Sequence, residues 1–407
     1  MNESTDVAII GAGPSGAIVA ALLRKQGLQV VVLEQAHFPR FSIGESLLPQ
    51  CMEFIREAGM WDAVNAAGFQ YKNGAAFARD GATASFDFRD KFSPGPGTTF
   101  QIQRAHFDQL LAEEAAAAGA DIRFGHRIEA FHYSAGRPVL TFRDEGDRLC
   151  QIEAGFVLDA SGFGRVLPRL LDLEQPSDFP VRMSLFTHIE DNIRDPRHDR
   201  DKILIVVHPQ LVDVWYWLIP FSNGRCSVGV VARKEFFAID DHTPEQLLRD
   251  ALAASPDLSA LLTRAVFDTP VRQLGGYAAN VKSLWGPGFA LLGNAGEFLD
   301  PVFSSGVTIA MKSASLAAPL VTRALGGGQV DWELEYAQPL RRGVDTFRTY
   351  VTAWYDGTFQ QVIFSDRHKP DIRAMISSIL AGYAWDTDNP YVRESRRRLA
   401  TLVELCG

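Results

Sequence analysis

The chain has 407 residues, of which 46% are hydrophobic, and its formal net charge at pH 7 is −9. A chain of this size and composition can bury a sizeable core, either as two closely packed domains or as one large domain. The acidic balance argues against a nucleic-acid partner, because the binding of phosphates needs a basic face.

Cysteine usage and hydropathy exclude further classes of protein. The four cysteines lie far apart and show neither disulfide nor metal-ligand spacing, so we expect no metal site. No segment offers the roughly eighteen consecutive apolar residues of a membrane span, and the first residues lack the pattern of a signal peptide. We therefore expect a cytoplasmic protein without a membrane span.

The N-terminal segment carries the most informative motif. An apolar strand over residues 6–10 runs into Gly11-Ala12-Gly13-Pro14-Ser15-Gly16, and a helix-compatible segment follows. A second apolar strand, residues 29–33, ends at Glu34. In such a βαβ unit the glycines allow a tight turn and bring the backbone close to a pyrophosphate, while the acid accepts ribose hydroxyls. The segment therefore predicts a dinucleotide site.

Further along the chain, helical and strand patterns alternate. Helices are expected at 49–58, 104–118, 244–264, 307–325 and over most of 332–407. Antiparallel strands are expected within 68–103, and further strands at 121–124, 139–142, 156–159, 182–189, 203–208, 212–219, 225–232 and 289–293. The turn at residues 222–225 is typical of a hairpin.

This order of elements predicts an α/β fold with discontinuous domains. We expect a Rossmann-like dinucleotide-binding domain, an interleaved and mostly antiparallel substrate domain, and a helical C-terminal region. The boundaries are 1–67, 104–170 and 285–330 for the first, 68–103 and 171–284 for the second, and 331–407 for the third.

Three further segments indicate which kind of dinucleotide-binding protein the chain resembles. Arg104 opens a long helix, residues 157–162 (Val-Leu-Asp-Ala-Ser-Gly) end a strand, and residues 291–301 end another. With the glycine loop, these segments resemble the FAD-binding motifs of the flavin monooxygenase branch of the glutathione-reductase-type flavoproteins. The resemblance implies that all four segments contact FAD. Asn294 stands where the family usually has Asp, and its amide can still hydrogen-bond a ribityl hydroxyl.

Within this branch the chain is similar to the flavin-dependent halogenases. Residues 215–220, Trp-Tyr-Trp-Leu-Ile-Pro, fit the Trp-x-Trp-x-Ile-Pro signature of that family. Residues 43–49 resemble its Gly-Glu-Ser loop, residues 69–77 the segment with its active-site lysine, and residues 300–307 the loop that binds flavin and halide. The chain is more similar to the halogenases that act on phenols, pyrroles and carrier-tethered substrates than to those that act on free tryptophan.

The resemblance implies an enzyme that uses reduced FAD, O₂ and chloride or bromide. Its substrate would be an electron-rich aromatic, pyrrole or polyketide-type molecule, either free or bound to a carrier protein. A separate flavin reductase is the expected partner, because no second Gly-x-Gly-x-x-Gly motif follows a strand elsewhere in the chain.

Three side chains are predicted to be catalytic. Lys72 matches the family lysine, whose ammonium or amine positions an electrophilic halogen; the alternative is an ordinary exposed lysine. Trp215 and Trp217 alternate on a strand and therefore point to one face. There they either keep the organic substrate from the oxidant or simply pack the sheet.

The remaining candidates bind the cofactor or the halide. The predicted cofactor-binding residues are Gly11, Gly13, Ser15, Gly16, Glu34, Arg40, Glu45, Ser46, Arg104, Asp159, Gly293, Asn294, Asp300, Ser305, Gly306 and Val307. The turn at residues 304–306 can offer backbone N–H groups to a halide, or can be a plain helix N-cap. None of the nine histidines is assigned a role.

Two alternative functions stay open. The first is a non-halogenating FAD-dependent monooxygenase or dehydrogenase/reductase of the same superfamily. It is favoured by a C-terminal region shorter than in many halogenases and by residues 379–386, which resemble halogenase-like oxidoreductases. The second is a flavin-bound protein that serves in binding or redox sensing.

Overall fold

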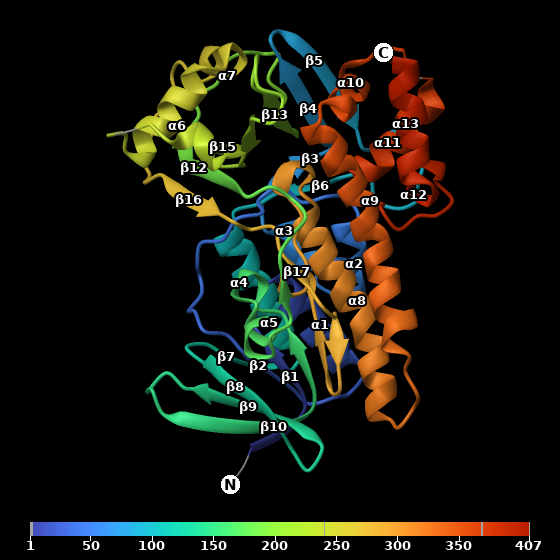
Figure 1. Ribbon diagram of the computed structural model, residues 1–407. Coiled ribbons are helices and arrows are strands. Elements are labelled where there is room, and N and C mark those ends of the chain that lie inside the picture. The colour runs from blue at the N-terminus through green and yellow to red at the C-terminus, as the bar shows by residue number, and fades with distance from the viewer. Residues whose placement is uncertain (1–2, 240, 368, 407) are drawn as a thin grey trace.

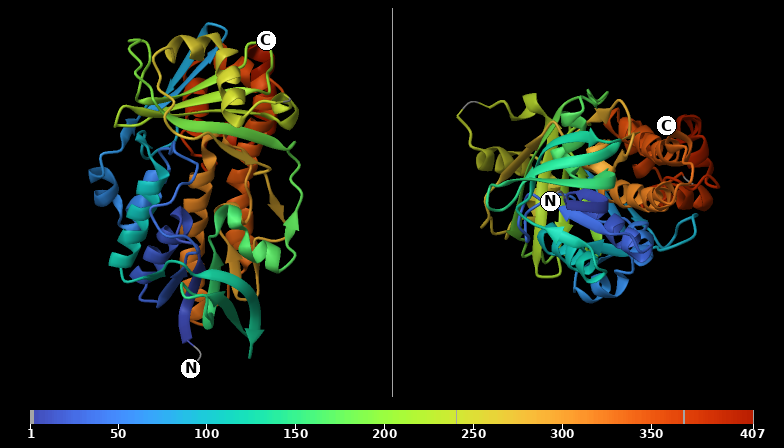
Figure 2. Two further views of the ribbon diagram at one scale, coloured as in Figure 1. Left: turned by 90° about the vertical axis from the view of Figure 1, so that its left-hand side faces the viewer. Right: turned by 90° about the horizontal axis from the view of Figure 1, so that it is seen from below.

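The computed structural model describes residues 3–239, 241–367 and 369–406. Two large sheets lie toward opposite ends of an elongated molecule (Figures 1 and 2). The N-terminus lies beside the first sheet and the C-terminus beside the second (Figure 1). The predicted α/β fold class, with parallel and antiparallel sheets and C-terminal helices, is confirmed.

The first sheet forms the dinucleotide fold. Its order is β18-β19-β10-β1-β2-β7, and β8 and β9 extend it as a hairpin beside β10. The pairs of β1 with β2 and β10, β2 with β7, and β10 with β19 are parallel. The strands are β1 (Glu3–Ile10), β2 (Val30–Leu33), β7 (Asp121–Arg123), β8 (Arg127–Ser134), β9 (Arg137–Arg143), β10 (Leu149–Asp159), β18 (Trp285–Gly286) and β19 (Phe289–Leu291).

Helices cover this sheet, with the apolar strand residues buried beneath them. They are α1 (Pro14–Lys25), α2 (Cys51–Ala58), α3 (Trp61–Ala66), α4 (Arg104–Ala117), α5 (Val166–Leu170) and α8 (Ser305–Leu325). Helix α1 packs between α4 and α8 and is buried from Pro14 to Leu23. Its small residues, alanines and a glycine, allow this close packing of helix against strand.

The second sheet is mostly antiparallel, with the order β16-β12-β15-β14-β13-β4-β5. Its strands are β4 (Gly74–Arg79), β5 (Ala82–Asp87), β12 (Arg182–Glu190), β13 (Lys202–Val207), β14 (Trp215–Pro220), β15 (Arg225–Arg233) and β16 (Arg272–Gly275). One face packs with α6 (Pro244–Ala253) and α7 (Pro256–Leu261) around Tyr216 and Leu218. The other face presents Trp215 and Trp217 to a cluster that includes the C-terminal helices.

The C-terminal helices cover that second face of the sheet (Figure 1). They are α9 (Gln338–Tyr355), α10 (Thr358–Phe364), α11 (Pro370–Leu380), α12 (Pro390–Arg393) and α13 (Ser395–Cys406). Two short ribbons complete the fold, β3 (Gln70–Lys72) with β6 (Thr99–Gln101) and β11 (Glu174–Gln175) with β17 (Asn280–Val281).

The structure differs from the expectation in the pairing of one strand, in strands and helices that were not predicted, and in one helix boundary. Strand β4 pairs in parallel with the distant β13, although residues 68–103 were expected to form antiparallel strands only. Strand β8 (Arg127–Ser134) was not predicted, since its alternation of apolar and polar residues is interrupted by a bulge near Glu129. The helix expected at 244–264 is divided into α6 and α7, because Pro256 begins a new helix after Ser255.

Candidate functional site

A cavity of about 350 Å³ lies between the dinucleotide fold and the second sheet. At one end it is lined by the glycine loop and Glu34, and at the other by Ile203, Trp215 and Trp217 of the second sheet. Of the predicted site residues, those lining it are Gly11, Gly13, Ser15, Glu34, Arg40, Glu45, Ser46, Arg104, Trp215, Trp217, Asn294, Gly306 and Val307.

The glycines of the N-terminal loop serve different purposes. A Cβ on Gly16 would lie 2.0 Å from the Gly11 carbonyl oxygen, and Gly11 has a φ of +94°, so the fold itself requires these two glycines. A Cβ on Gly13 would meet nothing among the described residues closer than an Arg40 nitrogen at 3.5 Å. The fold therefore leaves room at Gly13, where the motif brings a pyrophosphate close to the backbone.

Glu34 is held firmly at the end of β2. Its two carboxylate oxygens accept hydrogen bonds from the backbone N–H groups of Ala12 and Ala36, each at 2.9 Å. Each oxygen keeps a further lone pair, which a ribose hydroxyl can use. The carboxylate is thus oriented before any ligand binds.

Two arginines beside the cavity share one buried carboxylate. Arg104 donates to both oxygens of Asp108 at 2.7 and 2.8 Å, and also to the Ile43 carbonyl oxygen. Arg40 forms an ion pair with the same carboxylate at 3.1 Å. Asp108 carries one negative charge against two guanidinium groups, so a net positive charge faces the cavity. That charge suits the phosphates of a dinucleotide.

The N-terminus of α8 lies at the cavity, whose lining includes Ser304, Gly306 and Val307. Ser304, at the N-cap, has a φ of +55° and makes no side-chain capping hydrogen bond within the described part of the chain. The first N–H groups of α8 therefore lack the hydroxyl partner that a plain serine N-cap would supply. Nearby, the buried Oδ1 atom of Asn294 has no hydrogen-bond partner among the described residues.

Several predicted cofactor residues shape the site without lining the cavity. Asp159 is fully buried, and its carboxylate accepts hydrogen bonds from the N–H groups of Ser161 (2.9 Å) and Leu167 (2.7 Å). Burial raises the pKa of Asp159. Gly293 has a φ of +51° and lies against α8, where a Cβ would be 2.8 Å from that of Ala310. Gly16 and Ser305 are likewise buried outside the lining.

Asp300 also lies outside the cavity lining. Its carboxylate accepts hydrogen bonds from the Val302 N–H group at 3.0 Å and from the Tyr355 hydroxyl at 2.8 Å. Burial raises the pKa of Asp300 to about 6. The Tyr355 hydroxyl in turn accepts a hydrogen bond from the Trp215 indole at 2.9 Å. The chain of contacts links the loop before α8 to the cavity wall.

The two tryptophans form part of the cavity wall. Their ring centroids are 5.9 Å apart, and their exposed fractions are only 2% and 4%. The Trp217 indole donates to the Ser227 hydroxyl at 3.0 Å, so both indole N–H groups are satisfied within the wall. Both rings face the cavity side of β14, in keeping with the alternation along the strand.

Lys72 lies behind the cavity lining. It is fully buried, and its ammonium donates to the Ser46 hydroxyl at 2.7 Å and to the Leu47 carbonyl oxygen at 2.8 Å. Desolvation lowers the pKa of Lys72 from 10.5 to about 7. Ser46 lines the cavity and Lys72 does not, so the lysine reaches the cavity through this hydroxyl.

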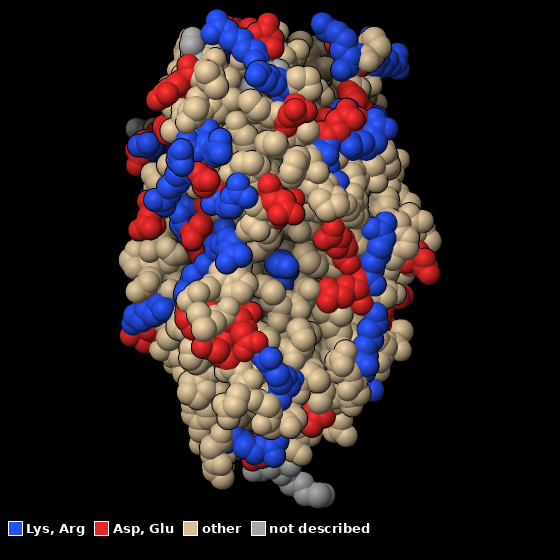
Figure 3. Space-filling model, turned by 90° about the vertical axis from the view of Figure 1, so that its right-hand side faces the viewer, with Lys and Arg blue, Asp and Glu red and all other residues tan. Residues whose placement is uncertain are grey.

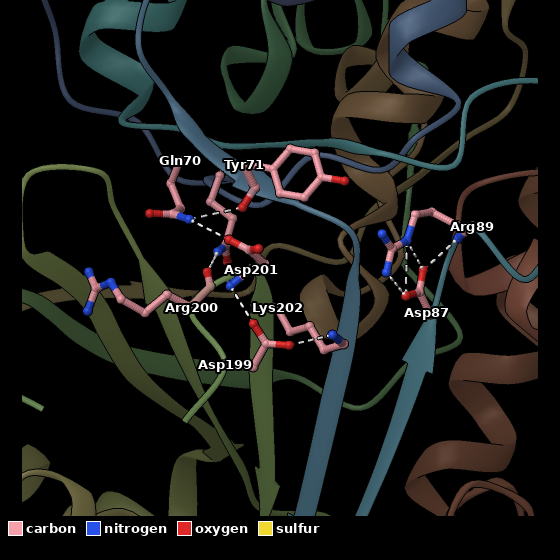
Figure 4. A network of polar contacts seen from close by, with 9 residues as sticks. Gln70, Tyr71, Asp87, Arg89, Asp199, Arg200, Asp201 and Lys202 are labelled. Atoms are coloured by element: carbon pink, nitrogen blue, oxygen red, sulfur yellow. Dashed lines mark hydrogen bonds and ion pairs between the residues drawn. The ribbon is translucent and has the colours of Figure 1, made fainter. Parts of the chain in front are cut away.

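A polar network fixes the strand that carries Lys72 from its outer side (Figure 4). The Gln70 amide donates to the Asp201 carboxylate at 3.1 Å, and the Asn73 N–H group donates to the Asp201 carbonyl oxygen at 2.8 Å. In the same network, Lys202 forms a 2.5 Å ion pair with Asp199. The segment before β13 thus holds β3 in place.

Sequence reasoning missed residues that line the cavity and one that contacts its lining. Phe41 and Phe298 line the cavity. His188, which received no role, lies outside the lining, and its Nε2 atom is 2.7 Å from the carboxylate of Glu45, which lines the cavity. No local motif marks these side chains, although Phe41 is close enough in sequence to the Gly-Glu-Ser loop to have been considered.

Within 3–239, 241–367 and 369–406, no cluster of His, Cys, Asp and Glu is arranged to hold a metal ion. None of the helices formed by these residues has both the length and the apolar character needed to cross a bilayer. On the face drawn in Figure 3, acidic and basic side chains are interspersed.

Similarity to known proteins identifies the family. The FAD binding domain family matches residues 4–275, more than half of the chain. The crystal structure of a flavoprotein/dehydrogenase from Cytophaga hutchinsonii is 44% identical, with 99% of each chain covered and a TM-score of 0.95. The chain belongs to the family of FAD-binding flavoproteins. The predicted cofactor, FAD, and the predicted class, FAD-dependent oxidoreductase, are thereby confirmed.

This flavoprotein is also similar to halogenases. The tryptophan halogenase family matches residues 212–366, which include the Trp-x-Trp-x-Ile-Pro strand and α8. The pyrrole-2-carbonyl peptidyl-carrier-protein chlorinase of Pseudomonas fluorescens is 27% identical, with 98% of this chain and 94% of its own covered. The structure of a flavin-dependent brominase triple mutant is 25% identical and covers 98% of this chain and 100% of its own, with a TM-score of 0.84. The predicted resemblance to flavin-dependent halogenases is confirmed.

The residues that line the cavity are chemically suited to bind FAD. Gly13 leaves open space beside the backbone, Arg40 and Arg104 bring positive charge, and Glu34 offers carboxylate lone pairs. The unpartnered Asn294 Oδ1 atom supplies an acceptor where the family motif binds the ribityl chain. Bound FAD would supply redox chemistry with O₂, and the glycine loop, Glu34 and the two arginines would hold it.

Proposed function

We propose that this flavoprotein halogenates an electron-rich aromatic, pyrrole or polyketide-type substrate with reduced FAD, O₂ and chloride or bromide. The observation that carries the proposal is the burial of Lys72, whose pKa is lowered to about 7. At neutral pH such a lysine is present in both protonation states, so it can hydrogen-bond a hypohalous acid or accept its halogen. An exposed surface lysine would have neither property.

The cavity geometry supports the same proposal. Ser46 connects the Lys72 ammonium to the cavity, and the uncapped N-terminus of α8 offers N–H groups to an anion. Trp215 and Trp217 line the cavity, and in the proposed reaction they would limit the access of an organic substrate to the oxidant. These residues would bind the halide, exclude bulk water and position the reactive halogen.

The substrate and partners belong to the same proposal. The Pseudomonas fluorescens chlorinase, by its name, acts on a pyrrole-2-carbonyl group held on a peptidyl carrier protein. By that similarity, we infer a substrate of aromatic or pyrrole type, which a carrier protein can present. A separate flavin reductase would deliver reduced FAD, and the reaction would take place in the cytoplasm.

The decisive experiment combines reduced FAD, O₂ and bromide with monochlorodimedone and a phenol panel, and identifies products by mass spectrometry. The proposal expects brominated product from wild-type protein and none from Lys72→Met, which keeps the length and burial of the side chain. Lys282→Met, at an exposed ion pair with Asp172, is the matched control and should keep full activity. Bromination by the Lys72→Met variant would refute the assigned role.

Two observations favour the non-halogenating alternative. Lys72 does not line the cavity, and the 44% identical structure is described as a flavoprotein/dehydrogenase. The same experiment separates the two functions. Hydroxylated or desaturated product that forms without halide would support a monooxygenase or dehydrogenase/reductase and would exclude halogenation as the main activity.

A further inference from the structure

The buried carboxylate of Glu45 has one oxygen in use and one free. Its Oε1 atom accepts a hydrogen bond from His188 Nε2 at 2.7 Å, and its side chain is 1% exposed. Its Oε2 atom is buried and has no partner among the described residues. A buried carboxylate oxygen without a donor is costly, so such an atom calls for a ligand that brings one.

The position of this free oxygen limits which part of a ligand can reach it. Glu45 and Ser46 line the cavity, as do Trp215 and Trp217. The ring of His188, the partner of Glu45, contacts Phe41, which stacks on Phe186 beside Trp217, with successive centroids 5.9, 5.9 and 5.8 Å apart. Glu45 therefore lies near the apolar wall. The dinucleotide motif places the adenosine and pyrophosphate at the Glu34 end. The ring system of FAD would therefore lie toward Glu45 and the apolar side chains of Trp215 and Trp217.

The Glu45 side chain is rigid enough to recognise an individual atom. Its backbone carbonyl oxygen accepts a hydrogen bond from the Ile102 N–H group at 2.7 Å, and the Leu47 N–H group donates to the Phe100 carbonyl oxygen at 3.1 Å. On the other side, His188 lies between the rings of Phe41 and Phe221, with centroids 5.9 and 5.2 Å away. Loop and histidine together hold the carboxylate in one orientation.

The polar edge of the oxidised flavin ring carries two carbonyl acceptors and one donor, the imide N–H group. A carboxylate repels the carbonyl oxygens and accepts only from the N–H group. We infer that Glu45, held by His188, accepts a hydrogen bond from the imide N–H of the flavin ring. The inference rests on the FAD site and is independent of whether the enzyme halogenates.

The test compares the binding of FAD with that of 3-methyl-FAD, in which a methyl group replaces the imide hydrogen. Dissociation constants are measured by flavin fluorescence on protein freed of flavin, with no halide or reductant. Wild-type protein should bind 3-methyl-FAD about tenfold or more weakly than FAD, because the buried carboxylate loses its donor. The ratio of the dissociation constant of 3-methyl-FAD to that of FAD is the quantity compared. A ratio near one in wild-type protein would overturn the inference.

Variants test whether Glu45 causes the difference between the dissociation constants of FAD and 3-methyl-FAD. In Glu45→Ala the ratio should fall close to one. Glu53→Ala, which removes an acid in the first turn of α2 that does not line the cavity, should keep the wild-type ratio. A ratio that stays high in Glu45→Ala would show that the methyl group clashes elsewhere and would refute the contact. If Glu45→Ala does not fold, Glu45→Gln decides, since its weaker amide acceptor should reduce the ratio several-fold and an unchanged ratio would refute the contact.

A second pair of variants tests whether His188 positions the Glu45 carboxylate. His188→Gln keeps a side-chain donor and should preserve most of the discrimination, whereas His188→Leu removes the donor and should lower it. Equal ratios in these two variants would overturn the part assigned to the histidine. A wild-type protein that binds neither flavin would refute the cofactor cavity and this inference with it, whatever the halogenation assay gives.

Discussion

The Nζ atom of Lys72 lies 2.7 Å from the hydroxyl oxygen of Ser46, and only Ser46 of the two lines the cavity. The Ser46 hydroxyl therefore stands between the Lys72 amine and the cavity. In the proposed reaction, a rotation of the Ser46 side chain would open a path from the cavity to the amine. The amine would otherwise stay desolvated, as its complete burial requires.

The depressed pKa of Lys72 predicts a pH-dependent cost to folding. Its pKa is about 7 in the folded protein and 10.5 without burial, so the unfolded chain binds more protons between these pH values. Wild-type stability should therefore rise relative to Lys72→Met as the pH increases from about 7 to about 10, on the order of 1 kcal/mol per pH unit. Urea denaturation at several pH values measures this difference, and parallel stability curves would contradict it.

A second prediction separates the two kinds of glycine in the N-terminal loop. Gly13→Val should fold but lose FAD, because the new side chain fills the open space beside Arg40. Gly16→Val should fail to fold, because its Cβ would lie 2.0 Å from the Gly11 carbonyl oxygen. Circular dichroism and FAD titration report the two outcomes separately. Tight FAD binding by Gly13→Val would mean that the pyrophosphate lies elsewhere.

Local sequence patterns predicted those parts of the site that a short segment builds. The glycine loop and Glu34 belong to one βαβ unit, so their spacing alone places them together. The alternation in residues 215–217 likewise predicted that both tryptophans share a face. In each case one strand or one turn determines the geometry, and the sequence carries the full signal.

Features that depend on distant segments could not be predicted in this way. His188 is 143 residues from its partner Glu45, and nothing around it differs from an ordinary strand residue. The parallel pairing of β4 with β13 likewise joins segments more than a hundred positions apart. Asp159 and Asp300 match family motifs, but their buried carboxylates accept hydrogen bonds from groups of the protein. The donors are the Ser161 N–H group for Asp159 and the Tyr355 hydroxyl for Asp300.

The bridge formed by Tyr355 gives a third prediction. Its hydroxyl donates to Asp300 and accepts from the Trp215 indole, so Tyr355→Phe leaves a buried carboxylate oxygen and an indole N–H group without partners. The loss should lower the free energy of unfolding by roughly 1–3 kcal/mol. Thermal unfolding of the variant, with Tyr71→Phe at a half-exposed position as control, measures the effect. A variant as stable as wild type would mean that the bridge contributes nothing.

The last prediction concerns the wall formed by Trp215 and Trp217. If these rings keep the organic substrate and water from the oxidising side of the cavity, a smaller ring should open a path through the wall. Trp215→Phe and Trp217→Phe preserve an aromatic ring, so folding and FAD binding should survive. A full truncation to Ala would cost on the order of 3–5 kcal/mol.

The measurement for the wall is the ratio of halogenated product to hydrogen peroxide per reduced flavin consumed. This ratio should fall in both Trp→Phe variants, because each leaves a gap in a wall whose tryptophans are at most 4% exposed. Tyr216→Phe is the matched control, since Tyr216 sits between the two tryptophans and faces the opposite side of β14. If the tryptophan variants fold, bind FAD and keep the wild-type ratio, the pair only packs the sheet, and the barrier must be formed by other residues of the cavity.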